Sequence, residues 1–304
     1  MAFELTILGS NAAVPAHGRY MTSQALTIRN RHFLIDCAEG TQMRLQEYKV
    51  RFQKINHIFI SHLHGDHIFG LPGLILSMSL NHRKEELFIY SPPGLKELIE
   101  TVWRISQSHL TFSVVFRESN PEVSERIYED DILTVDTIPL KHRIAAHGFL
   151  FKEKPHPRKM LKEKIAEYNI PFHALNGIKK GADWVLDSGR IVSNAELTTN
   201  PPKARSFAFC SDTAYSEAII PLIEGVDLLY HEATFTHDLM AQAEITGHST
   251  ALQAAQIAKK ANVKKLIIGH FSSRYIELQP LLNEAKTVFS DTELALDATV
   301  FSVR

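Results

Sequence analysis

The run Ser61-His62-Leu63-His64-Gly65-Asp66-His67 follows directly on the apolar residues Ile58–Ile60. It places three histidines and one carboxylate within six residues, which has few structural uses. In a turn, His62 and His64 can point to one side while Asp66 and His67 reach a neighbouring point. Imidazole nitrogens and carboxylate oxygens suit a catalytic divalent metal such as Zn²⁺. The run predicts a metal site, because a merely solvated loop would not need to end a buried strand.

Two ligands per metal are not enough, so the chain must supply more from elsewhere. A carboxylate can bridge two cations, and histidines on either side would complete two sites. Singly, each of the candidates below could be a surface or capping residue, but each also follows a strand-like run. His142 follows Asp131–Leu140, Asp212 follows Ser206–Cys210, and His270 follows Val263–Gly269.

Apolar runs rich in β-branched and aromatic residues, separated by Gly, Pro and Asn, predict strands in the first 150 residues. After residue 205, strands alternate with helices, which indicates a layered α/β domain with a mixed sheet. Helices are predicted at Pro93–Ser106 and Ser249–Ala261. Strands are predicted at Ala25–Ile28, Phe33–Cys37, Ile58–Ser61, Leu87–Tyr90, Ser113–Phe116, Ser206–Cys210, Asp227–Tyr230 and Val263–Ile268.

The composition is that of an ordinary globular protein of 304 residues, 44% hydrophobic and 22% charged. No apolar run is long enough to span a bilayer, so no membrane partner is expected. The N-terminal Met1–Ile7 alternates like a strand and lacks the features of a signal peptide. Cys37 and Cys210 both lie in apolar runs, which favours two buried thiols over a disulfide and a reducing, cytoplasmic location.

The segment 152–180 differs in charge from the rest of the chain. It has eight Lys or Arg against three acids, a net +5, whereas the whole chain carries −1. Prolines surround a short basic helix predicted at Arg158–Tyr168. We interpret the segment as an excursion from the fold without a core of its own. Its basic residues are Lys152, Lys154, Arg158, Lys159, Lys162, Lys164, Lys179 and Lys180.

The order His62-x-His64-x-Asp66-His67, His142, Asp212, His270 resembles the metallo-β-lactamase superfamily over nearly the whole chain. The resemblance implies an α/β fold, the αββα four-layer sandwich, as a single domain of residues 1–304 with two Zn²⁺ per subunit. It also assigns the ligands. His62, His64 and His142 would hold one zinc, Asp66, His67 and His270 the other, and Asp212 would bridge them.

Four further stretches resemble the short form of tRNase Z, and together they are more specific than any one alone. The segment 152–180 also falls where that family carries a protruding tRNA-binding arm. Three positions depart from the pattern: Ser206 replaces an Asn, Ser211 a common Gly, and Pro171-Phe172-His173 a Gly-Pro pair. The matching stretches are His231–Thr234 (HEAT), His248–Thr250 (HST), Pro201–Ser206 (PxKxRN) and the N-terminal loop Gly9–Pro15.

This resemblance implies a zinc-dependent endoribonuclease that removes the 3′ trailer from precursor tRNA. The tRNA would keep a 3′-OH and the trailer a 5′-phosphate. The arm, together with Lys203 and Arg205, would bind RNA. The resemblance further implies a homodimer in which the arm of one subunit serves the active site of the other.

Three residues are candidates for the chemistry. Asp66 sits beside the nucleophile in this family's arrangement, so it would accept a proton or, as a zinc ligand, chiefly orient the water. His248 opens a predicted helix start and is the candidate general acid. Glu232 could keep His248 protonated and correctly turned, because a carboxylate raises the pKa of a neighbouring histidine.

Other functions remain open on the residues alone. A two-metal hydrolase of another phosphodiester, or of a small ester or thioester, would need no basic arm. A non-catalytic RNA-binding module would be expected to have a broken ligand set, whereas all seven candidates are present. An oxygen reductase would need iron and a flavin domain, for which the chain has no room. Among the remaining histidines, His147 is the one most easily mistaken for a ligand.

Overall fold

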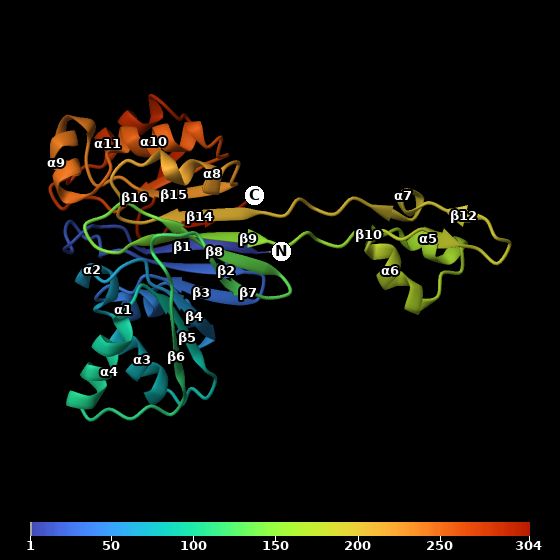
Figure 1. Ribbon diagram of the computed structural model, residues 1–304, viewed down its shortest axis with the longest axis horizontal. Coiled ribbons are helices and arrows are strands. Elements are labelled where there is room, and N and C mark those ends of the chain that lie inside the picture. The colour runs from blue at the N-terminus through green and yellow to red at the C-terminus, as the bar shows by residue number, and fades with distance from the viewer. Residues whose placement is uncertain (1) are drawn as a thin grey trace. The chain divides into compact units, whose positions relative to one another are not determined.

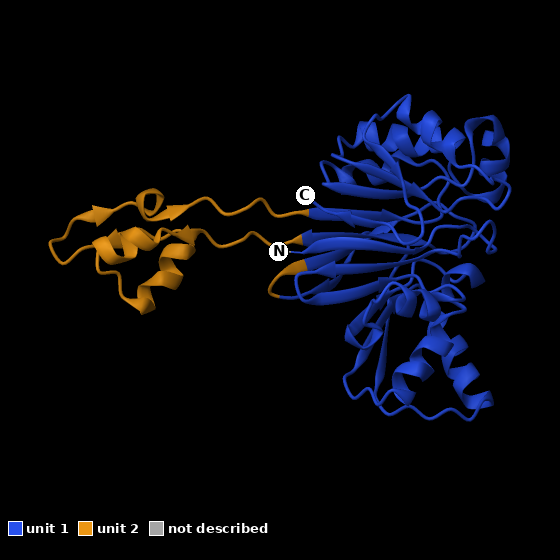
Figure 2. Cartoon of the chain, turned by 180° about the vertical axis from the view of Figure 1, so that it is seen from behind, with its two compact units in different colours: residues 1–130, 134–152, 206–304 blue, residues 131–133, 153–205 orange. Residues whose placement is uncertain are grey.

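The computed structural model describes residues 2–304, which divide into two compact units (Figure 2). Unit 1 comprises the residues up to Asp130 together with Thr134–Lys152 and Ser206–Arg304. Unit 2 comprises Asp131–Leu133 and Glu153–Arg205. Of the helices that the structure describes, none is long and apolar enough to cross a membrane.

Unit 1 contains two seven-stranded sheets. The first has the order β18-β1-β2-β3-β4-β5-β6, and its strands β3 to β6 run parallel. Parallel neighbours end at the same edge of a sheet, so the segments that follow them gather there. The bounds are β1 (Phe3–Gly9), β2 (Ser23–Ile28), β3 (Arg31–Ile35), β4 (Ile55–Phe59), β5 (Leu87–Ser91), β6 (Val114–Glu118) and β18 (Val300–Ser302).

The second sheet has the order β17-β16-β15-β14-β9-β8-β7. Strands β14 to β17 run parallel, and β9 joins β14 in antiparallel register. Both sheets are therefore mixed, as the sequence predicts. The bounds are β7 (Arg126–Glu129), β8 (Leu133–Pro139), β9 (His147–Glu153), β14 (Ser206–Cys210), β15 (Leu228–Glu232), β16 (Leu266–Gly269) and β17 (Thr292–Leu294).

Aromatic rings join the two sheets of unit 1 across their inner faces. The ring centroid of Phe59 in β4 lies 5.3 Å from that of Phe149 in β9, and Phe33 in β3 lies 5.7 Å from Phe151. All four side chains are fully buried, so this layer is a closed core. Rings of this size contribute much of the apolar area that folding removes from water.

Helices cover the outer faces of the two sheets and complete four layers (Figure 1). Side chains of α1, α3 and α4 pack on the first sheet, and those of α8, α10 and α11 pack on the second. The order of layers is therefore αββα. The bounds are α1 (Thr41–Glu47), α2 (Gly65–Ile68), α3 (Leu71–Leu80), α4 (Leu95–Ile105), α8 (Ile220–Ile223), α9 (Met240–Thr246), α10 (Ala251–Lys260) and α11 (Gln279–Lys286).

Unit 2 has a small core of its own, contrary to the expectation of an excursion without one. Met160, Ile170, Ile178, Val192 and Leu197 are its buried members. The last two lie beyond Lys180, and for this reason the compact unit continues past the predicted segment to Arg205. Its elements are β10 (Lys159–Met160), α5 (Lys162–Glu167), α6 (Leu175–Lys179), β11 (Trp184–Val185), β12 (Ile191–Val192), α7 (Asn194–Leu197) and β13 (Thr198–Thr199).

The basic helix predicted at Arg158–Tyr168 is wrong at its N-terminal end, since α5 begins at Lys162. The preceding residues form β10, which pairs with β13 in antiparallel register. Arg158 Nε also donates a 2.6 Å hydrogen bond to Thr198 Oγ1. These long-range bonds hold the first predicted turn in an extended conformation.

Candidate metal centre

The seven predicted ligands come together at one edge of the sheets of unit 1. His62 and His64 lie in the loop after β4, and Asp66 and His67 lie in α2. His142, Asp212 and His270 lie in the loops that follow β8, β14 and β16. Their donor atoms form overlapping groups that share Asp212.

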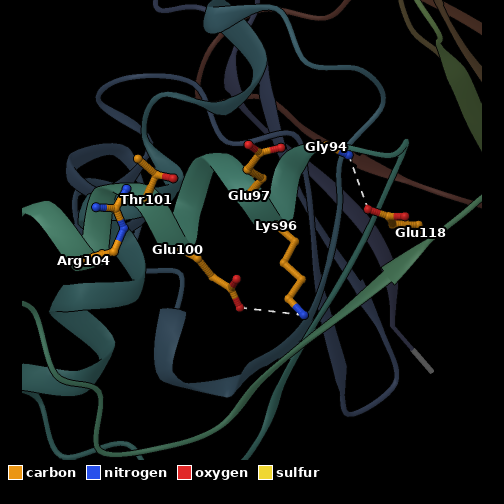
Figure 3. Close-up of a pocket in the computed structure, with 7 residues that line it drawn as sticks. All are labelled: Gly94, Lys96, Glu97, Glu100, Thr101, Arg104 and Glu118. Atoms are coloured by element: carbon orange, nitrogen blue, oxygen red, sulfur yellow. Dashed lines mark hydrogen bonds and ion pairs between the residues drawn. The ribbon is translucent and has the colours of Figure 1, made fainter.

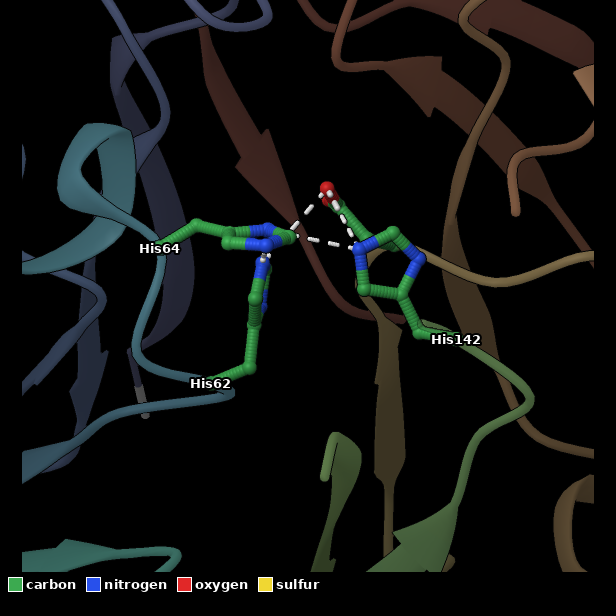
Figure 4. A group of neighbouring side chains, drawn as sticks. His62, His64 and His142 are labelled. Atoms are coloured by element: carbon green, nitrogen blue, oxygen red, sulfur yellow. Dashed lines mark hydrogen bonds and ion pairs between the residues drawn. The ribbon is translucent and has the colours of Figure 1, made fainter. Parts of the chain in front are cut away.

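The first group consists of His62, His64, His142 and Asp212 (Figure 4). His62 Nε2 lies 3.0 Å and His142 Nε2 3.3 Å from His64 Nδ1. Asp212 Oδ2 lies 3.6 Å from His62 Nε2 and 3.9 Å from His142 Nε2. Three imidazole nitrogens and one carboxylate oxygen therefore surround a single point.

The second group consists of Asp66, His67 and His270, with the other oxygen of Asp212. Asp212 Oδ1 lies 3.4 Å from His67 Nε2 and 3.2 Å from His270 Nε2. Asp66 Oδ2 lies 3.6 Å from His67 Nε2 and 3.8 Å from His270 Nε2. The two oxygens of Asp212 thus face different groups, which is the geometry of a bridging ligand.

The separations fit two divalent cations. Donor atoms held at about 2.0–2.1 Å from a tetrahedral Zn²⁺ lie roughly 3.3 Å apart, close to the distances above. His67 Nε2 and His270 Nε2 are also buried and make no hydrogen bond within the described residues. A buried polar atom without a hydrogen bond is costly, and a cation at each point would satisfy both nitrogens.

The charges of the donors agree with this fit. Burial holds the pKa of His62 well below its ordinary value, so its ring is neutral and can ligate a metal. Burial alone would raise the pKa of Asp212, but the surrounding histidines, His270 first, hold it well below the usual range. The shared ligand is therefore an ionised carboxylate, suited to bridging.

Hydrogen bonds from the far side of the rings fix the orientation of the ligands. His67 Nδ1 donates to Asp36 Oδ2 at 2.8 Å, and His142 Nδ1 donates to the Gly247 carbonyl at 2.8 Å. With Nδ1 as the donor in each ring, Nε2 is the nitrogen that faces the metal position. Asp36 is fully buried and also accepts from the Ser61 backbone N–H and Oγ.

Asp36 is a functional residue that the sequence predictions missed. It follows the strand-like part of Phe33–Cys37 just as Asp212 follows Ser206–Cys210, so the same rule could have found it. It lies outside both donor groups and acts only through His67 and Ser61.

Glu232 is fully buried and serves as an acceptor for five donors. Its Oε1 accepts from the backbone N–H of Thr213 and of Ser249, and its Oε2 accepts from the N–H and Oγ1 of Thr234. The fifth donor is His248 Nδ1, 2.9 Å from Oε1. This bond leaves His248 Nε2 as the ring nitrogen available to a substrate.

The same contact sets the protonation of His248. Burial works against the charged ring, but the charge of Glu232 and its hydrogen bond outweigh burial and raise the pKa of His248 to about 9. His248 also forms a group with Asp212 and His270 whose donor atoms lie within 4.8 Å of one another, and its ring lies 5.3 Å from that of His142 and 5.4 Å from that of His270. A protonated imidazole thus lies next to the metal positions.

The donors open into a hollow of about 470 Å³. Asp66 and His248 line it, and the backbone N–H of Ala13 donates to Asp66 Oδ2 at 2.8 Å across its wall. Two arginines, Arg143 and Arg274, also line it, although neither was predicted as a site residue. The hollow therefore combines metal donors, a proton donor and positive charge.

A second hollow of similar volume lies along α4 (Figure 3). Two pairs of its groups interact with each other: Lys96 with Glu100 at 3.8 Å, and the Gly94 N–H with Glu118 Oε1 at 3.3 Å. No residue of this hollow belongs to a cluster of metal donors among the described residues. The two hollows are alike in size but not in chemistry.

His147 lies outside the donor groups, in agreement with its exclusion from the predicted ligands. Its Nε2 is 3.1 Å from Ser119 Oγ, and burial lowers its pKa to about 4. It is a core histidine behind the site. Cys37 and Cys210 are free and buried, so the expectation of two buried thiols is confirmed.

Comparison with known proteins identifies the family. A chain from Bacteroides fragilis described as ribonuclease Z is 45% identical over 99% of both chains. A ribonuclease Z from Cytophaga hutchinsonii is 46% identical over the whole chain and 97% of that relative. The chain belongs to the ribonuclease Z family. The predicted family and the class of enzyme, a hydrolytic endoribonuclease, are confirmed.

Solved structures confirm the fold expected of a ribonuclease Z. The structure of human tRNase Z, short form, matches with a TM-score of 0.73 and 28% identity, covering 99% of each chain. The metallo-β-lactamase fold protein YhfI from Bacillus subtilis matches with a TM-score of 0.71 and 19% identity, over 99% of this chain and 98% of that one. The αββα sandwich is thus the metallo-β-lactamase fold.

A family model described as "Anti-Pycsar protein Apyc1" matches residues 3–154. These residues include the histidine loop and His142. They end before Asp212, Glu232, His248 and His270, so the model covers only part of the site. The ribonuclease Z relatives match both halves of the chain.

Of the basic residues predicted to bind RNA, three have strong partners inside unit 2. Arg205 forms a two-pronged pair with buried Glu153 at 2.8–2.9 Å, and Arg158 donates to Thr198 and Asn200. Lys164 pairs with Glu167 at 2.8 Å. The exposed ones are Lys152, Lys159, Lys162, Lys179, Lys180 and Lys203, and Lys154 is half-buried.

Glu232→Gln should lower the pKa of His248 in the metal-free protein, because it removes the charge that opposes burial. The wild-type ring should titrate near pH 9 by NMR. Its raised pKa contributes stability that is complete below about pH 6.5 and is lost as pH rises through 9, so the variant should lose this dependence. His147, which should titrate near pH 4 in both proteins, is the internal control. An unchanged His248 pKa would contradict the assigned contact.

Proposed function

We propose that this chain is a two-zinc endoribonuclease that removes 3′ trailers from precursor tRNA, leaving a 3′-OH on the tRNA and a 5′-phosphate on the trailer. The observation that carries the proposal is the position of Asp212, whose two oxygens face separate groups of imidazoles 3.2–3.9 Å away. Membership of the ribonuclease Z family supplies the class of substrate.

The chain offers the residues that two zinc ions require. His62, His64 and His142 would hold one ion, Asp66, His67 and His270 the other, and Asp212 both. When bound, such ions supply a hydroxide at neutral pH and neutralise charge on the phosphate. The neutral ring of His62 and the ionised Asp212 are already in the protonation states that ligation needs, whereas His67 would release a proton on binding a metal, because Asp212 and Asp36 outweigh burial and raise its pKa.

Asp66 holds and orients the attacking water in this proposal. Burial would raise its pKa, but His270 and His67 outweigh burial and keep the carboxyl ionised. The hydrogen bond from the Ala13 N–H fixes its orientation. Because the pKa is low, Asp66 acts more by orienting the water than by taking up a proton permanently.

His248 donates the proton that the leaving 3′ oxygen needs. Its Nδ1 is held by Glu232, so Nε2 faces the substrate and carries the proton that is transferred. Glu232 stays ionised in its ring of donors and stabilises the charged imidazole. The two residues thus form a proton donor and its positioning partner.

Unit 2 supplies positive charge for RNA in this proposal. Residues 152–180 carry +5 while the rest of the chain carries −6. Phosphate contacts by its exposed lysines would position the substrate without reading sequence. We also propose a homodimer, in which the arm of one subunit serves the other, and a cytoplasmic location, which suits the two free thiols.

Incubation with a 3′-extended tRNA transcript tests the function. Mapping both product ends should give a 3′-OH on the tRNA and a 5′-phosphate on the trailer. Asp66→Ala should abolish cleavage, because it removes a metal donor and the group that orients the water. Glu97→Ala, at an exposed acid of the second hollow, should cleave normally. An Asp66→Ala protein with two metals and wild-type kcat would refute the site.

His248→Ala should lower kcat on precursor tRNA by roughly 10²–10⁴, the range for loss of a general acid. A phosphodiester with a nitrophenolate leaving group should lose far less, because that group departs without a proton. Steady-state kinetics on both substrates, with metal content checked, make the comparison. Equal losses on the two substrates would remove His248 from the acid role.

Replacing residues 154–204 with a short Gly/Ser turn tests the arm. Lys152 and Ser206 are paired neighbours on β9 and β14, so a short turn can rejoin the chain there. KM for precursor tRNA should rise while hydrolysis of a nitrophenyl phosphodiester stays unchanged, since phosphate contacts act equally on ground and transition states. The log–log salt slope of tRNA binding should flatten by roughly 3 to 4 units if four or five contacts are lost. Unchanged affinity and slope would show that the charge is only a solvated surface.

A further inference from the structure

The wall of the metal hollow carries an aromatic ring with an arginine stacked on it. The guanidinium carbon of Arg274 lies 4.9 Å from the ring centroid of Phe235. Phe235 is 5% exposed, whereas Arg274 is exposed, so the arginine covers the ring and presents its own outer face to the hollow. No step of the mechanism above uses either residue.

Hydrogen bonds position both members of this pair. The backbone of Phe235 bonds to that of Ser249 and Ala251, which fixes it beside His248. The turn that carries Arg274 is held by Arg19, which donates to the Tyr275 and Ile276 carbonyls, and Arg274 Nε donates to Ser272 Oγ at 3.2 Å. A flat cationic surface is therefore already formed in the wall.

This surface lies near the group that is proposed to protonate the leaving oxygen, and therefore near one side of the bond that is cleaved. The Phe235 ring lies 6.2 Å from the ring of His248, at 68° to it. In the proposed function His248 protonates the leaving 3′ oxygen, so the nucleoside attached to that oxygen lies next to His248. Its base is then within reach of the Phe235–Arg274 pair.

We propose that the Phe235–Arg274 pair is a subsite for the nucleobase on the 5′ side of the cleavage point, which stacks on the outer face of the Arg274 guanidinium. Arginine planes and aromatic rings both stack on unpaired bases, and such stacking tolerates any base. This subsite rests on the proposed function and extends it, because it fixes where the last nucleotide of the mature RNA lies. Arg274 is then a positioning residue for the phosphate that follows.

Arg143 provides a matched control. It lines the same hollow with the same charge, but no aromatic contact of its guanidinium is found within the described residues. Its backbone and Cγ instead lie close to Gly247, 3.4–3.5 Å from where a Cβ would be. Arg143 can attract phosphate through its charge, whereas Arg274 can also stack.

A double-mutant cycle between enzyme and substrate tests the subsite. The substrates are a precursor tRNA and the same RNA with an abasic nucleotide immediately 5′ of the cleavage point. For wild type, the missing base should lower kcat/KM by roughly 5- to 150-fold, the worth of one stacked base, chiefly through KM. Arg274→Ala should lose a similar factor on the intact RNA and little more on the abasic RNA.

Two variants separate stacking from charge. Arg274→Lys keeps the charge but not the plane, so it should behave like Arg274→Ala. Arg143→Ala should lower kcat/KM for both substrates. The abasic penalty, which is the factor by which the missing base lowers kcat/KM, should keep its wild-type size. Glu97→Ala, in the second hollow, is the unaffected control and should keep the wild-type rate on bis(4-nitrophenyl) phosphate and the wild-type abasic penalty.

The outcomes distinguish this subsite from the function it rests on. If the abasic and Arg274→Ala losses multiply independently, or if Arg274 couples instead to an abasic nucleotide on the 3′ side, the subsite is wrong while wild-type cleavage of the intact RNA still supports the enzyme. If wild type does not cleave the intact precursor but hydrolyses the nitrophenyl ester, the substrate class is wrong and the subsite falls with it.

Discussion

The structure depends on one buried carboxylate. Asp212 is 3% exposed and lies where the ends of the two sheets meet. An ionised group cannot be buried without compensating charge, and here the rings of His62, His67, His142 and His270 approach it from both sides. Without cations, carboxylate oxygens and partly protonated imidazole rings face one another here. Two cations, as proposed, would give each oxygen of Asp212 a positive partner of its own.

Strand register delivers the groups to this point. In the second sheet, Cys210 of β14 pairs with His231 of β15, which pairs with Ile268 of β16. Asp212, Glu232 and His270 therefore leave the sheet at nearly the same level. Stacked buried rings directly behind the site, such as Phe209 on Tyr230, 4.9 Å apart, help to hold this register. A slip of one residue would turn every one of these side chains to the other face.

Whether a feature of the structure could be predicted depends on whether its signal in the sequence is local. The metal donors were predictable because they are chemically unusual and stand at the ends of apolar runs. Phe235 and Arg274 were not, because each is ordinary in sequence and gains meaning only when a turn stacks them. The core of unit 2 was not predicted for a similar reason, since the cluster that contains Met160 is completed by Val192 and Leu197 from beyond Lys180. Long-range partners are invisible to a local pattern.

The run Gly247-His248-Ser249-Thr250 shows why a short motif can be specific. Gly247 ends α9 at φ +75°, and a Cβ there would lie 3.0 Å from His142 Nδ1, so the glycine both ends a helix and admits the ligand that its carbonyl orients. Ser249 gives its N–H to Glu232, and Thr250 caps α10 through Gln253. His248 is thus fixed by neighbours on both sides. Each residue type therefore meets a different physical requirement, and a change at any of these positions would disturb the placement of His142 or His248.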